Sequence, residues 1–181
     1  MDALFYFYLC PFLSWAFLLF FWANNLHRPG YIASVVSAAP TKVTGQIGAI
    51  ISAKDFCLFL HPLPGGDISK SEDRAVAPPN AGPLPQGFIK SAHFLSNKAD
   101  NYVQVTGRID RNKYKFSADD GGGQYDIKAP VGSKCAGYNY YVEFIEPDSQ
   151  IYCIRCCKDK ADCPVNKSNY GCEKVLGGNY Q

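Results

Sequence analysis

Charged residues are scarce in this chain of 181 residues, of which Asp, Glu, Lys and Arg make up only 19%. Lys and Arg together number 18 against 16 for Asp and Glu, and they form no basic stripe along the sequence. Proteins that bind nucleic acids need such a stripe, because much of their affinity comes from counterion release at the phosphates. The composition therefore argues against a nucleic-acid partner.

Groups that could perform catalysis are also few. The chain has three histidines and no Gly-x-Ser-x-Gly motif, so a nucleophile with an adjacent base is missing. Glu143 and Glu146 are close in sequence, but an offset of three on a strand sends them to opposite faces. They therefore cannot flank one glycosidic bond as a pair of catalytic carboxylates does. The sequence offers no catalytic residue and no cofactor site.

Metal ligands lack the required spacing. Structural zinc is held by two ligand pairs, whereas the chain has one Cys-x-x-Cys pair, Cys153 and Cys156, with no histidine nearby. The residues Asp119, Asp120 and Asp126 surround three glycines but lack the spacing of an EF-hand. We expect them to be solvated turn residues, and we predict no metal site.

The N-terminal region contains a long uncharged stretch. Residues 3–23 carry no charge and are numerous enough to span a bilayer. A second apolar run follows Arg28, and residues 36–38 (Val-Ser-Ala) fit the pattern that signal peptidase cleaves. We predict that residues 1–38 are a signal peptide or signal anchor and that residues 39–181 form a single secreted domain.

The distribution of cysteine favours secretion. Six of the eight cysteines fall within the last 47 residues, a density that is typical of oxidising compartments. We therefore predict an extracellular protein. The alternative is a protein anchored in the membrane by residues 3–23, which would then be its only contact with lipid.

The remaining sequence is typical of β-strands. It contains 12 Tyr and 12 Phe, and apolar and polar residues alternate in "VQVTGRID" and "YNYYVEFIE". Counting weaker patterns at residues 47–51, 56–60 and 113–116, we expect seven or eight short strands. Residues 61–87 hold six of the twelve prolines and are predicted to form a loop with one helical candidate at residues 72–77. The predicted fold is all-β, as a small sandwich or barrel with a disulfide-stapled C-terminal segment.

The cysteine cluster "IYCIRCCKDKADC" is best explained by disulfides. If residues 151–157 form a strand, Cys153 and Cys157 point to one face and Cys156 points to the other. We expect three disulfides among six cysteines, whose connectivity the sequence leaves open. These cysteines are Cys135, Cys153, Cys156, Cys157, Cys163 and Cys172. Cys57 is left either unpaired or in an alternative disulfide, and Cys10 in the leader is not expected to be its partner.

Two further kinds of surface site follow from the sequence. Asn166 begins an Asn-Lys-Ser sequon, so it is a candidate for N-glycosylation. Tyr138, Tyr140 and Tyr141 could stack against sugar rings, and the alternative is that these aromatic residues fill the core and form cross-strand pairs.

The run "EFIEPDSQIYCIRCCKDKADCPVNKSNYGCEKVLGGNY", together with "GFIKSAHFL", "VQVTGRID" and "DDGGGQYD", resembles small secreted cysteine-rich proteins of early-diverging, mucoromycete-type fungi. The resemblance covers roughly residues 43–181. It implies secretion behind a signal peptide, and it supplies no established activity. Members of this group often carry a cysteine after the Pro/Gly-rich loop that could pair with the one in "DFCLFL", whereas this chain has Ala77-Pro78-Pro79 there.

These features predict a secreted, non-catalytic interaction protein of the fungal cell surface or extracellular space. Its partner would be a cell-wall glycan or a surface protein. The alternative is a carbohydrate-binding or carbohydrate-active protein, such as a wall-loosening protein with a double-psi barrel.

Overall fold

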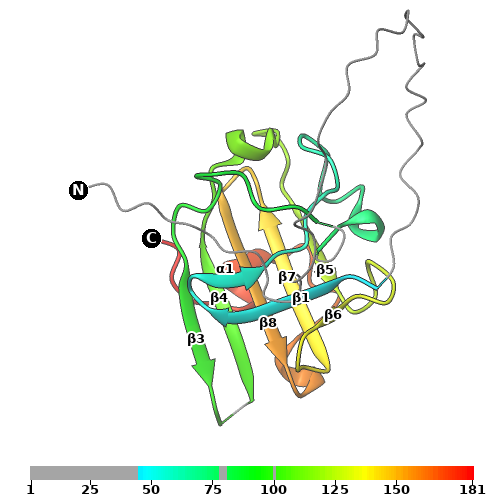
Figure 1. Cartoon of the computed structure of the whole chain (residues 1–181), viewed down its shortest axis with the longest axis vertical. Coiled ribbons are helices and arrows are strands. Elements are labelled where there is room, and N and C mark those ends of the chain that lie inside the picture. The colour runs from blue at the N-terminus through cyan, green and yellow to red at the C-terminus, as the bar shows by residue number, and fades with distance from the viewer. Residues whose placement is uncertain (1–44, 78–80, 100) are drawn as a thin grey trace, which may run out of the picture.

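The computed structural model describes residues 45–77, 81–99 and 101–181, which form two β-sheets, short 3₁₀ helices and one short α-helix (Figure 1). The larger sheet is antiparallel and has five strands in the order β3-β4-β8-β7-β5. Their bounds are β3 (His93–Asn97), β4 (Tyr102–Arg108), β8 (Ile151–Cys157), β7 (Tyr140–Glu146) and β5 (Gly123–Asp126). The predicted all-β fold is confirmed.

The smaller sheet has three strands in the order β2-β1-β6. Strand β1 (Ile47–Ser52) is antiparallel to β2 (Asp55–Cys57) and parallel to β6 (Lys134–Cys135). Figure 1 shows this sheet lying across one face of the five-stranded sheet, with β1 in front of β7 and β8. The two sheets together form a small sandwich, and we call the face of the larger sheet that they enclose the inner face.

The main core lies on the inner face, where alternate residues of the central strands point. Tyr141 and Ile145 of β7 and Tyr152 and Ile154 of β8 are at most 1% exposed and belong to one hydrophobic cluster. The ring of Phe59 stacks on the ring of Tyr141 with 4.6 Å between their centroids. Burial of these large side chains is the main source of stability for the sandwich.

The C-terminal segment covers the opposite face, which we call the outer face. Val142, Phe144 and Ile151 of the sheet form a second cluster with Leu176 and Tyr180 of that segment. The short helix α1 (Gly171–Val175) belongs to this layer and lies behind the sheet in Figure 1. Both faces of the central strands β4, β8 and β7 are therefore covered, and most of their side chains are buried.

One arginine fastens the C-terminal segment to the outer face. The guanidinium group of Arg155 donates hydrogen bonds to the carbonyl oxygens of Asp162 at 3.0 Å and Leu176 at 2.8 Å. Its Nε donates to Oε1 of Gln104 at 2.8 Å, and the ring of Tyr102 lies 4.2 Å from the guanidinium carbon. The hydrogen bonds to Asp162 and Leu176 satisfy backbone carbonyl groups that lie outside the β-sheets.

Three disulfides connect the layers through the central strand β8. Cys135–Cys156 joins β6 to the inner face, whereas Cys153–Cys172 and Cys157–Cys163 join the C-terminal segment to the outer face. The bridges leave the strand on both sides, as the alternation of side chains requires.

Cys57 is also disulfide-bonded, and the described residues include no free cysteine. The expectation of an unpaired Cys57 is therefore wrong, and the alternative of a further disulfide holds. The expectations for the leader, including Cys10, concern residues outside the described part of the chain.

Two of the predicted elements differ in the structure. The strand expected at residues 113–116 is replaced by the 3₁₀ helix η2 (Arg111–Tyr114), because the Asp110 side chain caps it by accepting the Asn112 N–H at 3.0 Å. Lys115 ends the helix in the left-handed region, with a φ of 57°. The expectation of solvated turn residues at Asp119, Asp120 and Asp126 is wrong for the last two, which are buried, because Gly123–Asp126 pair with β7 as strand β5.

In the described residues of the proline-rich segment, 61–77 and 81–87, the one helix is short. The 3₁₀ helix η1 (Glu72–Arg74) lies inside the predicted helical candidate, and an isolated bridge pairs Leu60 with Val76. A further short 3₁₀ helix, η3 (Lys160–Asp162), follows β8. Within the described residues, no helix has the length and hydropathy needed to cross a membrane.

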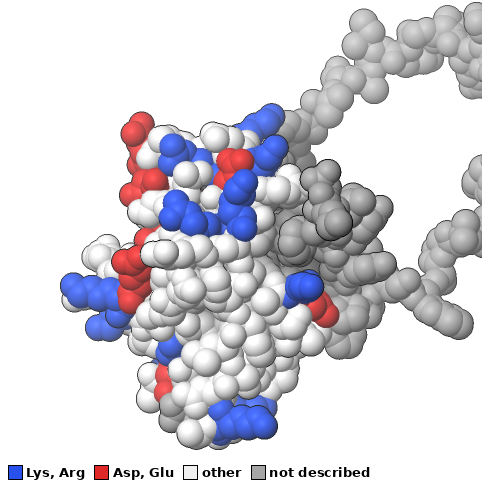
Figure 2. All heavy atoms as spheres, turned by 90° about the vertical axis from the view of Figure 1, so that its left-hand side faces the viewer, with Lys and Arg blue, Asp and Glu red and all other residues white. Residues whose placement is uncertain are grey.

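Strand β3 forms one edge of the five-stranded sheet. Its two central apolar side chains are partly exposed, Phe94 at 39% and Leu95 at 48%. Figure 2 shows this side of the molecule, where the middle of the surface is uncharged and the charged side chains lie toward its margins. The visible charges are mixed in sign and form no continuous basic surface on this side.

Candidate functional site

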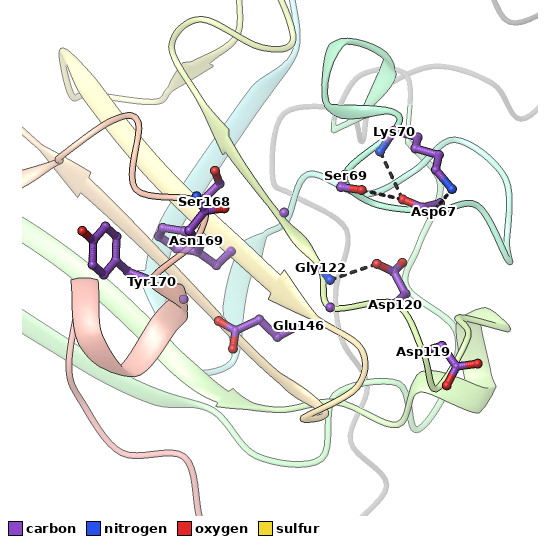
Figure 3. Close-up of a pocket in the computed structure, with 14 residues that line it drawn as sticks. Asp67, Ser69, Lys70, Asp119, Asp120, Gly122, Glu146, Ser168, Asn169 and Tyr170 are labelled. Atoms are coloured by element: carbon purple, nitrogen blue, oxygen red, sulfur yellow. Dashed lines mark hydrogen bonds and ion pairs between the residues drawn. The ribbon is translucent and has the colours of Figure 1, made fainter.

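Three surface hollows share the side chain of Tyr170. The first has a volume of about 540 Å³ and is lined by residues 67–70, 119–123 and 168–171 together with Glu146 of β7 (Figure 3). The second, of about 480 Å³, shares both Glu146 and Tyr170 with the first. The third, of about 330 Å³, lies beside Lys167 and Lys174. We call the first two hollows together the Tyr170 groove.

Tyr170 is the most exposed aromatic side chain of this region, at 53%. Its backbone N–H donates to the carbonyl oxygen of Lys167 at 2.9 Å, so the residue sits in a turn directly before α1. The ammonium groups of Lys167 and Lys174 lie 5.2 and 5.4 Å from the centre of its ring. Both lysines also line the third hollow, so these contacts hold the ring between the third hollow and the groove.

Glu146 lies where the two hollows of the groove meet. Its carboxylate accepts the backbone N–H of Cys172, and Figure 3 shows it between Tyr170 on one side and Asp120 on the other. Burial raises the pKa of Glu146 above its usual range, and the hydrogen bond from Cys172 opposes this rise. Because Cys172 is bonded to Cys153, the disulfide fixes one wall of the groove to the sheet.

The far end of the first hollow is rich in carboxylates. Asp120 is nearly buried and accepts the N–H groups of Ile68 at 3.1 Å and Gly122 at 2.9 Å, which gives it a structural role. Asp67 forms an ion pair with Lys70 at 3.0 Å, and this hydrogen-bonded lysine lowers the pKa of Asp67. The carboxylates of this hollow outnumber its cationic groups, because Asp119 and Glu146 add to the two aspartates.

Gly171 is required for this arrangement. It has a φ of +71°, and a Cβ atom at this position would lie 2.8 Å from Oε1 of Glu146. We expect Gly171→Ala to lower the free energy of unfolding by about 1–3 kcal/mol, through left-handed strain and displacement of Glu146. Urea denaturation measures this effect. Gly82→Ala serves as a control, because a Cβ at Gly82 meets no atom within 4 Å; equal losses for both variants would contradict the proposed crowding.

Tyr141, Tyr138 and Tyr140 do not form the expected aromatic surface. Tyr141 is fully buried, and its hydroxyl group shares a hydrogen bond of 2.7 Å with Ser133. Tyr138 and Tyr140 are half-buried and pack against different hydrophobic clusters on opposite faces of the sheet. The proposal that Tyr141 stacks on a sugar is therefore wrong, because its ring already stacks on Phe59 inside the sandwich.

The acidic residue Glu143 is enclosed in the sandwich. It is 0% exposed, and both of its oxygens accept the N–H of Phe59 at 3.1 Å. Burial raises its pKa well above the usual range, and the hydrogen bond from Phe59 only partly offsets this effect. Glu143 faces the inner core and Glu146 faces the outer layer, so the two carboxyl groups do not share a site.

The histidines and the acidic turn have structural roles in the described part of the chain. His61 is hydrogen-bonded to the backbone of Leu63, and Nε2 of His93 lies 2.8 Å from the carbonyl oxygen of Gln181. Among residues 45–77, 81–99 and 101–181, no three His, Cys, Asp or Glu side chains are close enough to hold a metal ion.

The sequon residue Asn166 is exposed, and its side-chain oxygen accepts a hydrogen bond from Nζ of Lys128 at 2.7 Å. An oligosaccharide could be attached at this position from outside the fold, which keeps glycosylation of Asn166 as a prediction.

The fold and the groove define a small cysteine-rich β-sandwich whose outer layer is held by disulfides. Comparison with curated proteins finds similarity to the appressorium protein ROW2 of the fungus Mycosarcoma maydis, with 31% identity over 147 residues. The match covers 68% of this chain and 50% of ROW2, so the chain spans about half the length of that protein. No protein family and no solved structure matches the chain.

Tyr170 was not recognised as a site residue from sequence. It lies in a polar segment without alternation, and the groove is assembled from segments that are about 50 residues apart. No pattern in the sequence distinguished Tyr170 from the other tyrosines of the chain.

Proposed function

We propose that this chain is a secreted, non-catalytic interaction protein of the fungal cell surface. Residues 1–38 would be removed as a signal peptide, and residues 39–181 would form the functional domain. We further infer that it belongs with the small secreted cysteine-rich proteins of early-diverging fungi. The observation that carries the proposal is the set of three disulfides that fix layers to both faces of one strand.

This disulfide arrangement supports secretion for a physical reason. Thiols in a reducing compartment stay unpaired, and the outer layer contains few large apolar side chains that could hold it in place. The similarity to a fungal protein whose name refers to the appressorium supports a role at the cell surface.

The chemistry of the acidic groups supports a non-catalytic role. Glu146 and Asp120 are engaged with backbone N–H groups, and Glu143 is enclosed between the sheets. Carbohydrate binding remains the second candidate, because the Tyr170 groove combines an exposed aromatic ring with polar walls.

Secretion can be tested by expressing the full chain with a C-terminal tag in a fungal host. We expect a product in the medium or the wall whose intact mass corresponds to a chain that starts at Ala39. Reduction should raise this mass by two hydrogens for each disulfide. Ala38→Phe should block cleavage, because signal peptidase requires a small residue at that position. Recovery of the complete chain from the membrane fraction, with no shorter product outside, would contradict the proposal.

A further inference from the structure

The Tyr170 groove has the shape of a site for an extended ligand. Its two hollows, of about 540 and 480 Å³, adjoin at Glu146 and Tyr170. Sites for single small molecules are usually concave and mainly apolar. The two hollows of this groove are lined by separate sets of residues, with Asp67, Ser69 and Lys70 in the first and Arg108 in the second, so several linked units of a polymer would fit it better than one compact molecule.

The groove lining combines hydrogen-bonding groups with one flat apolar surface. Ser168 and Asn169 provide a hydroxyl and an amide group, Glu146 provides a carboxylate, and the exposed ring of Tyr170 lies beside them (Figure 3). A sugar presents the complementary combination, with hydroxyl groups at its edge and C–H groups on its faces. The ammonium groups of Lys167 and Lys174 already contact the ring, so little ordering of the Tyr170 side chain is needed when a ligand binds.

Besides Tyr170, the described residues that line the groove offer no exposed apolar anchor for a protein partner. Phe144 and Ile151 line the two hollows, but they are only 1% and 7% exposed and belong to the outer-face core. Protein interfaces depend on buried aromatic or aliphatic anchors that insert into pockets. The lining of this groove therefore favours a glycan over a protein.

The charge of the groove restricts the kind of glycan. The two hollows are lined by five carboxylates, Asp67, Asp119, Asp120, Glu146 and Glu173, and by three cationic residues, Lys70, Arg108 and Lys174. The excess of negative charge lies in the first hollow, where Lys70 is the one cationic group in the lining. A polymer of acidic sugars would be repelled there, whereas a sugar with an ammonium group would be attracted.

We propose that the Tyr170 groove binds short stretches of an amino-sugar polymer, with one ring against Tyr170 and an ammonium group in the first hollow. This inference rests on the proposed function, because it names the ligand class of the interaction protein.

Calorimetric titration of the secreted protein with four short oligomers tests the proposal, namely glucosamine, N-acetylglucosamine, β-linked glucose and galacturonate. We expect the glucosamine oligomer to bind about tenfold or more tightly than the neutral oligomers and the galacturonate oligomer to bind most weakly. Added salt should reduce the preference for glucosamine.

Matched variants locate the ligand. Tyr170→Ala should weaken glucosamine binding about tenfold, whereas Tyr170→Phe should keep most of it, because the ring is retained. Asp119→Asn should reduce the preference for glucosamine over N-acetylglucosamine. Tyr138→Ala is the control, because Tyr138 also lies under a lysine, with 5.1 Å from Nζ of Lys158 to its ring centre, but does not line the groove. Thermal unfolding shows that each variant is folded.

Three outcomes would overturn the inference. The first is that Tyr170→Ala binds the glucosamine oligomer as tightly as the original protein does. The second is that the folded protein binds none of the oligomers, and the third is that a lysine-rich peptide occupies the groove while sugars do not. Secretion and retention in the wall are measured separately, so the proposed function could hold even if this ligand class is wrong.

Discussion

Replacing both Cys153 and Cys172 by alanine is expected to lower the free energy of unfolding by about 3 kcal/mol. The bridge joins residues that are 19 positions apart, and removing it increases the conformational freedom of the unfolded chain. It also releases α1 from β8, so Cys172 no longer positions its N–H against Glu146. We therefore expect the loss of stability to be accompanied by the loss of the groove wall.

The other disulfides provide matched controls for this prediction. Removing Cys135–Cys156, with a separation of 21, should cost a similar amount but should leave the outer layer in place, because this bridge lies on the inner face. Removing Cys157–Cys163, with a separation of 6, should cost about 2 kcal/mol. Urea denaturation measures the three losses, and hydrogen exchange measures protection in residues 163–180. Equal protection of those residues in all three variants would contradict the assignment of the bridges to different faces.

The stability of the protein is expected to fall as the pH rises above 4.5, chiefly because of Glu143. The folded-state pKa of Glu143 is raised well above its ordinary value of 4.5, so the folded protein retains a proton that the unfolded chain has released. The associated stability is fully present below pH 4.5 and is lost as the pH rises through the folded pKa. Tyr125 and Ile154 pair with Glu143 across the sheet, so neither neighbouring strand places a cationic side chain directly opposite it.

Glu143→Gln tests this account, because the amide oxygen can still accept the N–H of Phe59. Between pH 4.5 and pH 8, we expect the variant to lose less stability than the original protein, because it lacks the carboxyl group whose pKa is raised by burial. Burial also raises the pKa of Glu72 and Glu146, so a smaller slope of the same sign should remain in the variant. Urea denaturation at several pH values measures the two slopes, and identical slopes would show that Glu143 does not cause the pH dependence.

Local alternation allowed much of the sheet to be predicted from sequence. The period of two in residues 140–146 predicted strand β7. The condition that residues 151–157 form a strand is met by β8, and it placed Cys153 and Cys156 on opposite faces. The same pattern separated Glu143 from Glu146, because it depends only on the pleat of a strand. The strand expected at residues 113–116 was wrong, since the capping side chain of Asp110 outweighed a short alternating pattern.

The candidate site depends on contacts between distant parts of the chain, and alternation carries no information about them. The sequence left open whether Tyr141 stacks on sugars or fills the core. It fills the core, because the small sheet covers one face of the central strands and the C-terminal segment covers the other. The Tyr170 groove requires the turn at 119–123 and the segment at 168–171 to meet beside β7. Neither segment is periodic, so only the tertiary structure brings them together.

The central claim is that the outer-face disulfide Cys153–Cys172 builds a ligand-binding groove on a sheet that is folded without it. Calorimetric titration of the glucosamine oligomer into two double variants tests this claim most directly. We predict that Cys153→Ala/Cys172→Ala stays folded at low temperature but loses binding, whereas Cys135→Ala/Cys156→Ala, which removes the inner-face bridge, still binds. Binding of equal strength by both folded variants would contradict the account.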